Sequence, residues 1–198
     1  MNWFTRALRL GRVLREPSDP ATPIAELVEG WPAQIVGVAE AIGSLLTTPV
    51  APQPCIGFRL VVERRGAGGP GEAWGAVLVL QDCQSFSVRD ETGLAIVEKP
   101  VVLSVDVDVG GWAALPPEVY ALLGEANVSL GGRFRDYEFR FGMGLLKPGD
   151  HVSVEGRATL QIDPAVPAPA PRSLPETWHF KDSNAWPVIV RDVDDPEP

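Results

Sequence analysis

The stretch Leu146-Lys-Pro-Gly-Asp-His-Val-Ser-Val-Glu-Gly156 contains a tight turn followed by a strand with alternating side chains. Proline at position 148 and glycine at 149 are typical of a type II turn, whose third residue needs a positive φ. Beyond the turn, Val152 and Val154 take one face, and the polar residues beside them take the other. The stretch therefore predicts a strand over His151–Leu160 whose valines face a core.

The same period of two residues recurs along residues 33–160 and predicts a mostly β fold. Twenty glycines and twenty prolines among 198 residues make long helices unfavourable. One short helix is expected over Pro116–Gly124, and Trp74–Leu80, apolar on both faces, is expected to be a central, covered strand. The expected strands are Ala33–Ile42, Gly57–Arg65, Trp74–Leu80, Ser85–Asp90, Leu94–Glu98, Val101–Val109, Phe134–Phe141 and His151–Leu160. We therefore expect an antiparallel, barrel-like β domain with a short inserted helix and an N-terminal amphipathic helix.

The chain divides into six segments by composition. We expect an amphipathic basic helix at 1–16, a proline-rich linker with a short helix at 17–32, the β domain at 33–162, a proline-rich connector at 163–175, a returning segment at 176–191 and an acidic tail at 192–198. The short helix is expected over Ile24–Glu29, with Thr22 as its N-cap. In the returning segment, Trp186–Arg191 is expected to form an edge strand, because an internal proline suits an edge.

Charge and residue counts exclude several classes of function. The net charge of −9 argues against a nucleic-acid partner, because binding to phosphates normally needs clustered basic residues. Two cysteines and two histidines cannot supply the two zinc sites of a RING finger, so we expect neither a metal nor a cofactor. Cys55 and Cys83 are expected to be reduced and packed, since nothing marks the chain for export. The apolar runs are too short for the roughly 18–20 residues that span a bilayer, so we expect a cytoplasmic protein.

Residues 1–16 combine helical periodicity with a charge opposite to that of the rest of the chain. They carry +3, which leaves −12 on residues 17–198. A basic amphipathic helix of this kind can lie in a membrane interface, dock on an acidic partner, or fold back onto its own acidic domain. The candidate docking residues are Trp3, Phe4, Leu10 and Leu14 on the apolar side and Arg6, Arg9, Arg12 and Arg15 on the basic side.

Several landmarks occur in an order that resembles a known family. They are Gly37, Thr48-Pro49, Pro54-Cys55-Ile-Gly-Phe-Arg-Leu-Val-Val-Glu63, Trp74, Phe86-Ser-Val-Arg-Asp-Glu-Thr-Gly93, Tyr137-Glu138, Pro148-Gly149-Asp150 and Val152-Ser-Val-Glu-Gly156. Together they resemble the GIDE domain, also called the "beside a membrane" domain, of mitochondrial membrane-anchored ubiquitin ligases and bacterial membrane proteins. Family members have transmembrane helices beside the domain, and the eukaryotic ones add a RING. This chain shows neither, so the resemblance implies a bacterial interaction domain without ligase activity and transfers no catalytic residue.

The two histidines are weak candidates for catalysis. His151 follows Asp150 at a turn and is expected to face solvent. A Ser-His-Asp triad also needs a nucleophile on a specific turn, and no G-x-S-x-G motif occurs. His179 lies between Trp178 and Phe180 and is expected to be a packed or surface histidine. We therefore assign no catalytic residue.

Two further clusters have both a functional and a structural interpretation. Asp106 and Asp108 on one strand face could hold a hard cation if further oxygens join them, but the polar outer face of an antiparallel strand explains them better. Arg133, Arg135 and Arg140 alternate with Phe134, Tyr137, Phe139 and Phe141, as on surfaces that bind single-stranded nucleic acids. Asp136 and Glu138 lie among these arginines, so cross-strand ion pairs explain the mixture better.

The sequence favours a non-enzymatic interaction or scaffold domain of the GIDE type with a protein partner. Peripheral attachment to an anionic inner-membrane surface through the N-terminal helix, or membership of a larger assembly, is compatible with this hypothesis. The alternatives are an enzyme that uses carboxylates and an OB-like barrel that binds an oligomeric ligand. The sequence does not indicate the oligomeric state.

Overall fold

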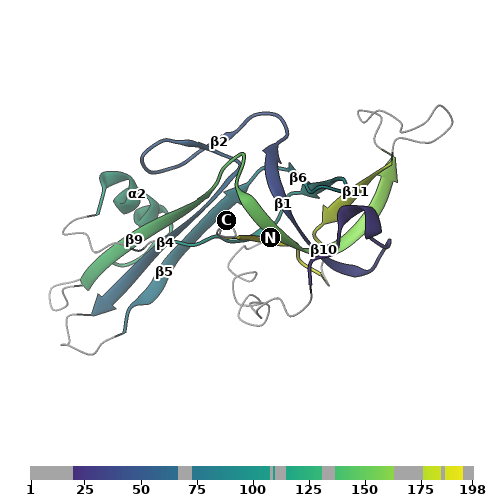
Figure 1. The fold of residues 1–198 in the computed structure, drawn as a ribbon. Coiled ribbons are helices and arrows are strands. Elements are labelled where there is room, and N and C mark those ends of the chain that lie inside the picture. The colour runs from purple at the N-terminus through teal and green to yellow at the C-terminus, as the bar shows by residue number, and fades with distance from the viewer. Residues whose placement is uncertain are drawn as a thin grey trace, which may run out of the picture.

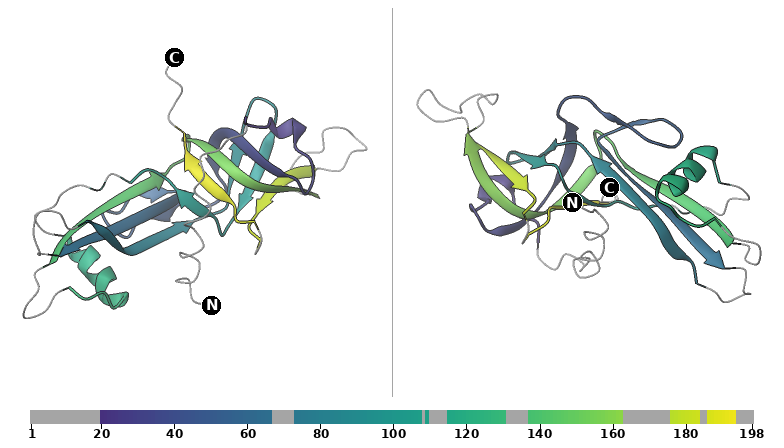
Figure 2. Two further views of the ribbon diagram at one scale, coloured as in Figure 1. Left: turned by 90° about the horizontal axis from the view of Figure 1, so that it is seen from below. Right: turned by 180° about the vertical axis from the view of Figure 1, so that it is seen from behind.

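Strands form most of the computed structural model, which describes residues 20–66, 73–107, 109, 115–130, 137–162, 176–183 and 186–193 (Figure 1). A closed barrel of five strands lies at one end of the molecule, and a three-stranded sheet covered by a helix lies at the other (Figure 2). The elements are η2 (Ile24–Glu26), β1 (Pro32–Ala41), β2 (Leu46–Thr47), β3 (Pro54–Cys55), β4 (Gly57–Gly66), β5 (Gly75–Cys83), β6 (Phe86–Arg89), β7 (Leu94–Glu98), β8 (Val102–Ser104), α2 (Pro117–Glu125), β9 (Tyr137–Leu146), β10 (His151–Ile162), β11 (Glu176–Lys181) and β12 (Ile189–Asp192).

The barrel is closed by β1, β6, β7, β11 and β10 in that order. Strand β1 pairs antiparallel with β6 on one side and with β10 on the other, which closes the ring. Strands β6 and β7 form a hairpin, β11 pairs antiparallel with β10, and β7 pairs with β11 in parallel. Strand β10 is long enough to contact β12 along its first half and β11 along its second half.

Apolar side chains that alternate along these strands fill the barrel. Val152, Val154 and Ala158 of β10 are fully buried there, as the alternation in the sequence predicts. Ile24 and Leu27 close one end. Because side chains on one face of a strand are two residues apart, the polar residues between them lie on the outside of the barrel.

The three-stranded sheet has the order β5-β4-β9, with β4 in the middle. Helix α2 packs on one face of it through Val119 and Leu123, which contact Leu60, Val62 and other apolar residues of the sheet in a second core. Pro117 occupies the first turn of this helix, where the missing N–H costs nothing.

Most expected elements are confirmed to within a few residues, including the strands around Gly57–Arg65, Ser85–Asp90 and Leu94–Glu98 and the helix expected over Pro116–Gly124. Gly149 has a φ of 97°, and Asp150 N donates to Lys147 O over 3.2 Å, as a type II turn requires. The mostly β, barrel-like fold is likewise confirmed. The expected N-terminal helix at 1–16, the connector at 163–175 and residues 194–198 lie outside the described residues.

Two predictions about the order of the strands are wrong. Strand β5, expected to be central and covered, is an edge strand, and Trp186–Arg191, expected at an edge, contributes β12, which lies between β10 and β8. Proline 187 precedes β12, which starts at Ile189, so it blocks no ladder hydrogen bond. Strand β11 was not expected at all. The apolar pattern of a strand reports which side chains are buried, not which strands lie beside it.

Three predicted boundaries also need correction. The strand expected over Val101–Val109 is only Val102–Ser104, because its partner β12 ends at Asp192, whose carboxylate accepts from the Asp106 N–H over 3.0 Å. Strand β9 runs to Leu146, beyond the expected end at Phe141. The helix expected over Ile24–Glu29 is a three-residue 3-10 turn with Pro23, not Thr22, at its N-cap.

Candidate functional site

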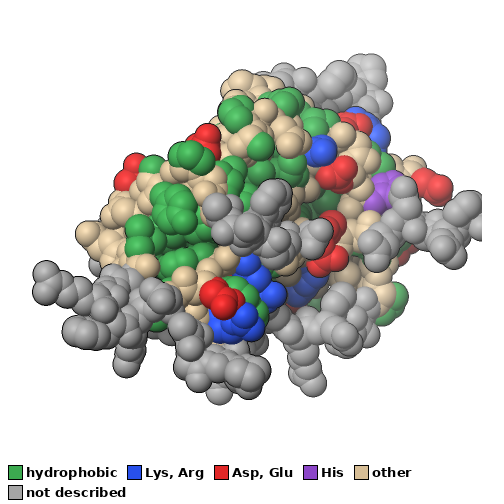
Figure 3. All heavy atoms as spheres, turned by 90° about the vertical axis from the view of Figure 1, so that its left-hand side faces the viewer, with side chains coloured by type: hydrophobic (Ala, Val, Ile, Leu, Met, Phe, Trp, Pro, Cys, Tyr) green, Lys and Arg blue, Asp and Glu red, His purple; other side chains and the backbone are tan. Residues whose placement is uncertain are grey.

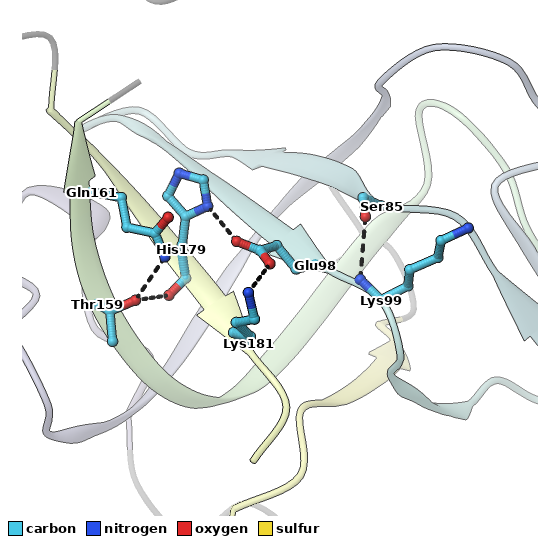
Figure 4. Close-up of polar contacts among 7 residues, drawn as sticks. All are labelled: Ser85, Glu98, Lys99, Thr159, Gln161, His179 and Lys181. Atoms are coloured by element: carbon cyan, nitrogen blue, oxygen red, sulfur yellow. Dashed lines mark hydrogen bonds and ion pairs between the residues drawn. The ribbon is translucent and has the colours of Figure 1, made fainter. Parts of the chain in front are cut away.

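A group of polar side chains lies on the outer face of the barrel, where β7 and β11 run parallel (Figure 4). Glu98 at the end of β7 accepts a hydrogen bond on Oε1 from His179 Nδ1 over 2.9 Å and pairs through Oε2 with Lys181 Nζ, also over 2.9 Å. The parallel register places Lys181 beside Glu98 and His179 beside Ile96. One carboxylate therefore connects two side chains of β11.

Strand β10 contributes the other side of this group. Thr159 Oγ1 donates to the His179 carbonyl over 3.3 Å, and Gln161 Nε2 donates to Thr159 Oγ1 over 3.4 Å (Figure 4). Thr159 and His179 are Cα partners in the β10–β11 ladder, so their side chains share a face. We call Glu98, Thr159, Gln161, His179 and Lys181 the outer polar cluster.

The charges of the outer polar cluster balance locally. The hydrogen bond from Lys181 lowers the pKa of Glu98 most; burial opposes this effect, and the His179 ring adds to it. The His179 side chain is only 11% exposed, whereas that of Lys181 is 61% exposed. His179 is thus a packed histidine, as expected, with its Nδ1–H fixed on a carboxylate.

The second ring nitrogen of His179 decides what the cluster can do chemically. Nε2 is buried and has no hydrogen-bond partner among the described residues. In a Ser-His-Asp triad this nitrogen takes the proton of the nucleophile. Glu98 and His179 supply the orienting carboxylate and the ring of such a triad, but no described hydroxyl or thiol bonds Nε2, so the cluster does not form one.

Asp150 and His151, the turn residues weighed for catalysis, lie where the turn leads into β10. The Asp150 carboxylate accepts from the Lys147 N–H over 2.7 Å within the type II turn. His151 is half-buried at the start of β10, opposite Val38 of β1. The expectation that His151 faces solvent is therefore only partly met.

No group of three or more His, Cys, Asp or Glu side chains that could hold a metal ion occurs in the part of the chain that the structure describes. Asp106 uses its backbone N–H to bind the Asp192 carboxylate. Asp108 lies outside the described residues, so the pair of Asp106 and Asp108 cannot be placed as a cation site.

Both cysteines are free and buried, as expected. Burial is the main reason that the pKa of Cys83 rises to about 12, and the Asp82 carboxylate adds to the effect. Burial also raises the pKa of Cys55. Because thiolates are the reactive form of cysteine, neither side chain is suited to nucleophilic catalysis.

The arginines of β4 and β9 form cross-strand ion pairs, as expected for Arg140 and Glu138. Arg140 Nε donates to Glu63 Oε2 over 2.6 Å, and Arg65 pairs with Glu138. Both guanidinium groups also lie over the Trp74 ring, at 4.8 Å for Arg65 and 4.5 Å for Arg140. Figure 3, which views this end of the molecule, shows basic side chains beside acidic ones rather than a continuous basic surface. Arg133, Phe134, Arg135 and Asp136 lie outside the described residues.

Large apolar side chains are exposed in the turn between η2 and β1 and at the end of β10. Trp31 is 69% exposed, Ile162 60% and Val28 57%, the three highest values among large apolar residues in the described ranges. The Gly30 N–H donates to the Ala158 carbonyl over 2.9 Å, which fixes the turn before β1 against β10. Trp31 N donates to Val28 O over 3.2 Å within this turn, whereas Ile162 ends β10 four residues beyond Ala158, opposite Glu176. We call Val28 and Trp31, in the turn that leads into β1, the apolar end.

Sequence reasoning identified neither Glu98 nor the apolar end. Glu98 and His179 are 81 residues apart, and only the parallel pairing of β7 with β11 joins them. Gly30 has a φ of 76° in the turn before Trp31. The signal for this turn in the sequence is Gly30-Trp31-Pro32, because glycine and proline mark turns.

The docking residues expected in the N-terminal helix, Trp3, Phe4, Arg6, Arg9, Leu10, Arg12, Leu14 and Arg15, lie outside the described residues. In the described ranges, no helix has the length and apolar character needed to cross a membrane. Comparisons of this chain with family models, curated proteins and solved structures find no match.

Proposed function

We propose that this protein is a non-enzymatic interaction domain that binds a protein partner through the apolar end of its barrel. The observation that carries this proposal is the exposure of Trp31 (69%) and Val28 (57%) in one turn of the chain, where Trp31 N donates to Val28 O over 3.2 Å. Exposed tryptophans surrounded by other apolar side chains are characteristic of the central residues of protein interfaces.

The rest of the molecule supports a binding role over catalysis. The outer polar cluster satisfies its charges internally, and the thiols are buried with raised pKa values. Polar groups that serve an enzyme are usually arranged around an accessible reacting position. The resemblance to the GIDE domain, whose members have no established catalytic residues in this domain, agrees with the same proposal.

The N-terminal segment adds a second contact in this proposal. Its +3 charge and its four arginines suit an anionic lipid surface, and its Trp3 and Phe4 suit the interface between headgroups and acyl chains. We infer a cytoplasmic protein held at the inner-membrane surface by residues 1–16, with the apolar end free to bind its partner.

A ligand-binding barrel is the second candidate, and the strand order favours it. Numbered along the chain, the five barrel strands are ordered first-second-third-fifth-fourth, with only the third and fifth parallel. This is the strand order of the OB-fold, whose second and third strands often bind oligonucleotides or oligosaccharides. Here those strands are β6 and β7. Their charged residues pair with neighbours, as Arg89 does with Glu40 over 2.8 Å, and the Phe86 ring is fully buried, so this face offers no described aromatic ring for base stacking.

Site-specific photo-crosslinking in native cells tests the proposed function. A photo-reactive phenylalanine derivative replaces Trp31 in one variant and Tyr120 in a matched control. Tyr120 is also an exposed aromatic residue, but it lies on α2 at the opposite end of the molecule. We expect a discrete crosslinked protein from position 31 and none from position 120. No adduct at position 31, or the same adduct from both positions, contradicts the proposal.

Binding to single-stranded oligonucleotides, measured by fluorescence anisotropy at low salt, distinguishes the second candidate. The interaction-domain proposal predicts no saturable binding. Saturable binding that Arg89→Ala weakens would favour the ligand-binding barrel instead.

A further inference from the structure

Three exposed carboxylates lie in or beside the turn that forms the apolar end. Glu26 and Glu29 belong to the turn itself. Glu91 lies on the β6–β7 turn next to Thr92, whose hydroxyl oxygen accepts from the Ala25 N–H over 3.1 Å. None of the three carboxylates has an ion-pair or hydrogen-bond partner within the described ranges. The apolar end is therefore bordered by negative charge that nothing described neutralises.

The sequence around this turn supplies no basic residue. Between Arg15 and Arg59 the chain contains neither lysine nor arginine. On the neighbouring strand β10, Arg157 is the Cα partner of Pro32, but its guanidinium lies over the Trp186 ring at 4.6 Å. An apolar centre with an acidic border is complementary to an apolar segment with a basic border.

Residues 1–16 of this chain have that complementary pattern. The apolar side of the expected helix consists of Trp3, Phe4, Leu10 and Leu14. With about 100° between successive residues, Arg6 and Arg15 border this apolar side, one on each flank, and Arg9 and Arg12 lie opposite it. Only the two border arginines could reach carboxylates beside an apolar contact.

The segment is also tethered close to the apolar end. The Thr22 N–H donates to the Gln34 carbonyl over 2.7 Å, so the chain runs beside β1 before it reaches η2. At about 3.3 Å per extended residue, this contact places Pro20 roughly 17 Å from Trp31. A helix over residues 1–16 is about 24 Å long, so it can span that distance from its link at residues 17–19. A tether this short favours a contact within one chain over the same contact between chains.

We propose that residues 1–16 cover the apolar end while the protein is free in solution. Their apolar side lies on Val28 and Trp31, and Arg6 and Arg15 lie beside the carboxylates. The same segment suits an anionic lipid surface, so lipid binding withdraws it and opens the apolar end. The docking stands on the charges and the tether, whereas its regulation of partner binding rests on the proposed function.

Photo-crosslinking of the purified full chain at low concentration tests the docking. The photo-reactive phenylalanine derivative again replaces Trp31, or Tyr120 in the control, and mass spectrometry identifies the crosslinked peptides. We expect an internal adduct between position 31 and residues 1–16 in protein of monomer size, and none from position 120. Phosphatidylserine vesicles at low salt should reduce the internal adduct.

Two matched double variants test the orientation of the segment. Arg6→Glu with Arg15→Glu reverses both border charges and should remove most of the internal adduct. Arg9→Glu with Arg12→Glu changes the net charge by the same amount on the opposite side, and it should leave the adduct in place. Equal loss in both variants contradicts the proposed contact.

No internal adduct, or an adduct between two copies of the chain, overturns the docking. An internal adduct that the vesicles leave unchanged overturns the release by lipid. The proposed function fails separately from this inference. A partner adduct in cells without an internal adduct sinks the docking alone, whereas an internal adduct without any partner adduct sinks the proposed function.

Discussion

At the scale of single residues, the polar groups of this protein are mostly committed to local structure. Asp90 illustrates this: its Oδ1 accepts from the N–H groups of Thr92 and Gly93 over 2.7 Å, and its Oδ2 accepts from Ile24 N over 2.8 Å. These bonds lower the pKa of Asp90 against the opposing effect of burial. One carboxylate thus builds the β6–β7 turn and caps η2, which contributes Ile24 to the barrel core.

Changing Glu98 to Gln should lower the free energy of unfolding by about 1–2 kcal/mol at neutral pH, because the ion pair with Lys181 and the charge on the His179 bond are lost. Folding lowers the pKa of Glu98 from its ordinary value of 4.5. The ionised Glu98 side chain therefore contributes its full stabilisation of the fold above pH 4.5. This contribution is lost as the pH falls through the lowered pKa of the folded state. Urea unfolding at pH 7 and pH 3 should show the difference between wild type and variant shrinking at pH 3.

The control for this measurement is Glu176→Gln, an exposed glutamate at the start of β11. It should change stability by less than about 0.5 kcal/mol at either pH. If Glu98→Gln lowers the free energy of unfolding by the same amount at pH 7 and pH 3, the charge of Glu98 is not the cause of the lost stability.

Thiol labelling should be slow at both cysteines in the native protein. Burial keeps Cys83, with a pKa of about 12, almost entirely protonated at pH 8, and Cys55 is fully buried. An aromatic disulfide reagent should react with fewer than one thiol over minutes in buffer and with both in denaturant. A Cys83→Ala variant assigns the remaining signal to Cys55. Rapid reaction of both thiols in buffer would contradict their burial.

At the scale of elements, the barrel depends on close approach of β1 to β6. A Cβ added at Gly37 would collide with the Arg89 carbonyl and lie 2.9 Å from a Val88 methyl carbon. The backbone of β6 cannot move aside without disturbing its pairing with β7. The close contact explains why this strand carries glycine at a position whose neighbours are Val36 and Val38.

Substituting Gly37 with Ala should therefore lower the free energy of unfolding by about 2–3 kcal/mol, the cost of overpacking a core. Gly75→Ala is the matched control, because it also lies in a strand and a Cβ there meets nothing within 4 Å. Thermal or urea unfolding should show a large loss for the first variant and almost none for the second. Equal effects of the two substitutions would refute the steric explanation.

At the scale of the whole molecule, the two ends expose different groups. The barrel presents the outer polar cluster and the apolar end, and the three-stranded sheet carries helix α2 on one face. Arg157 lies 4.6 Å from the Trp186 ring, so an aromatic residue and a cation also lie on the barrel.

Residues 1–16 should bind anionic vesicles weakly and with strong salt dependence. Each arginine near an anionic surface contributes about 1 kcal/mol, and the −12 charge of the rest of the chain opposes the contact. In sedimentation with phosphatidylserine vesicles, wild type should pellet at low salt, and a variant with Arg6, Arg9, Arg12 and Arg15 changed to Glu should not. A wild type that stays in the supernatant at low salt, with residues 1–16 protected from amide exchange, would favour docking onto its own domain.

The sequence by itself determined the features that neighbouring residues control. The alternation of Val152 and Val154 with polar residues, the type II turn at Pro148-Gly149 and the short helix near Pro117 follow from local dihedral preferences and side-chain periodicity. The burial of Cys55 and Cys83 follows from their place beside apolar strands. Such preferences act over a few residues and need no knowledge of the rest of the chain.

Only the tertiary structure decided which strands are neighbours. The parallel pairing of β7 with β11 brings Glu98 to His179, β5 lies at an edge although its sequence suits a centre, and Asp192 caps the end of the β8 ladder. Pairing over such distances depends on how the loops close and on which faces bury the most apolar surface together. Two strands with the same alternation can satisfy either position, so their own residues do not distinguish an edge from a centre.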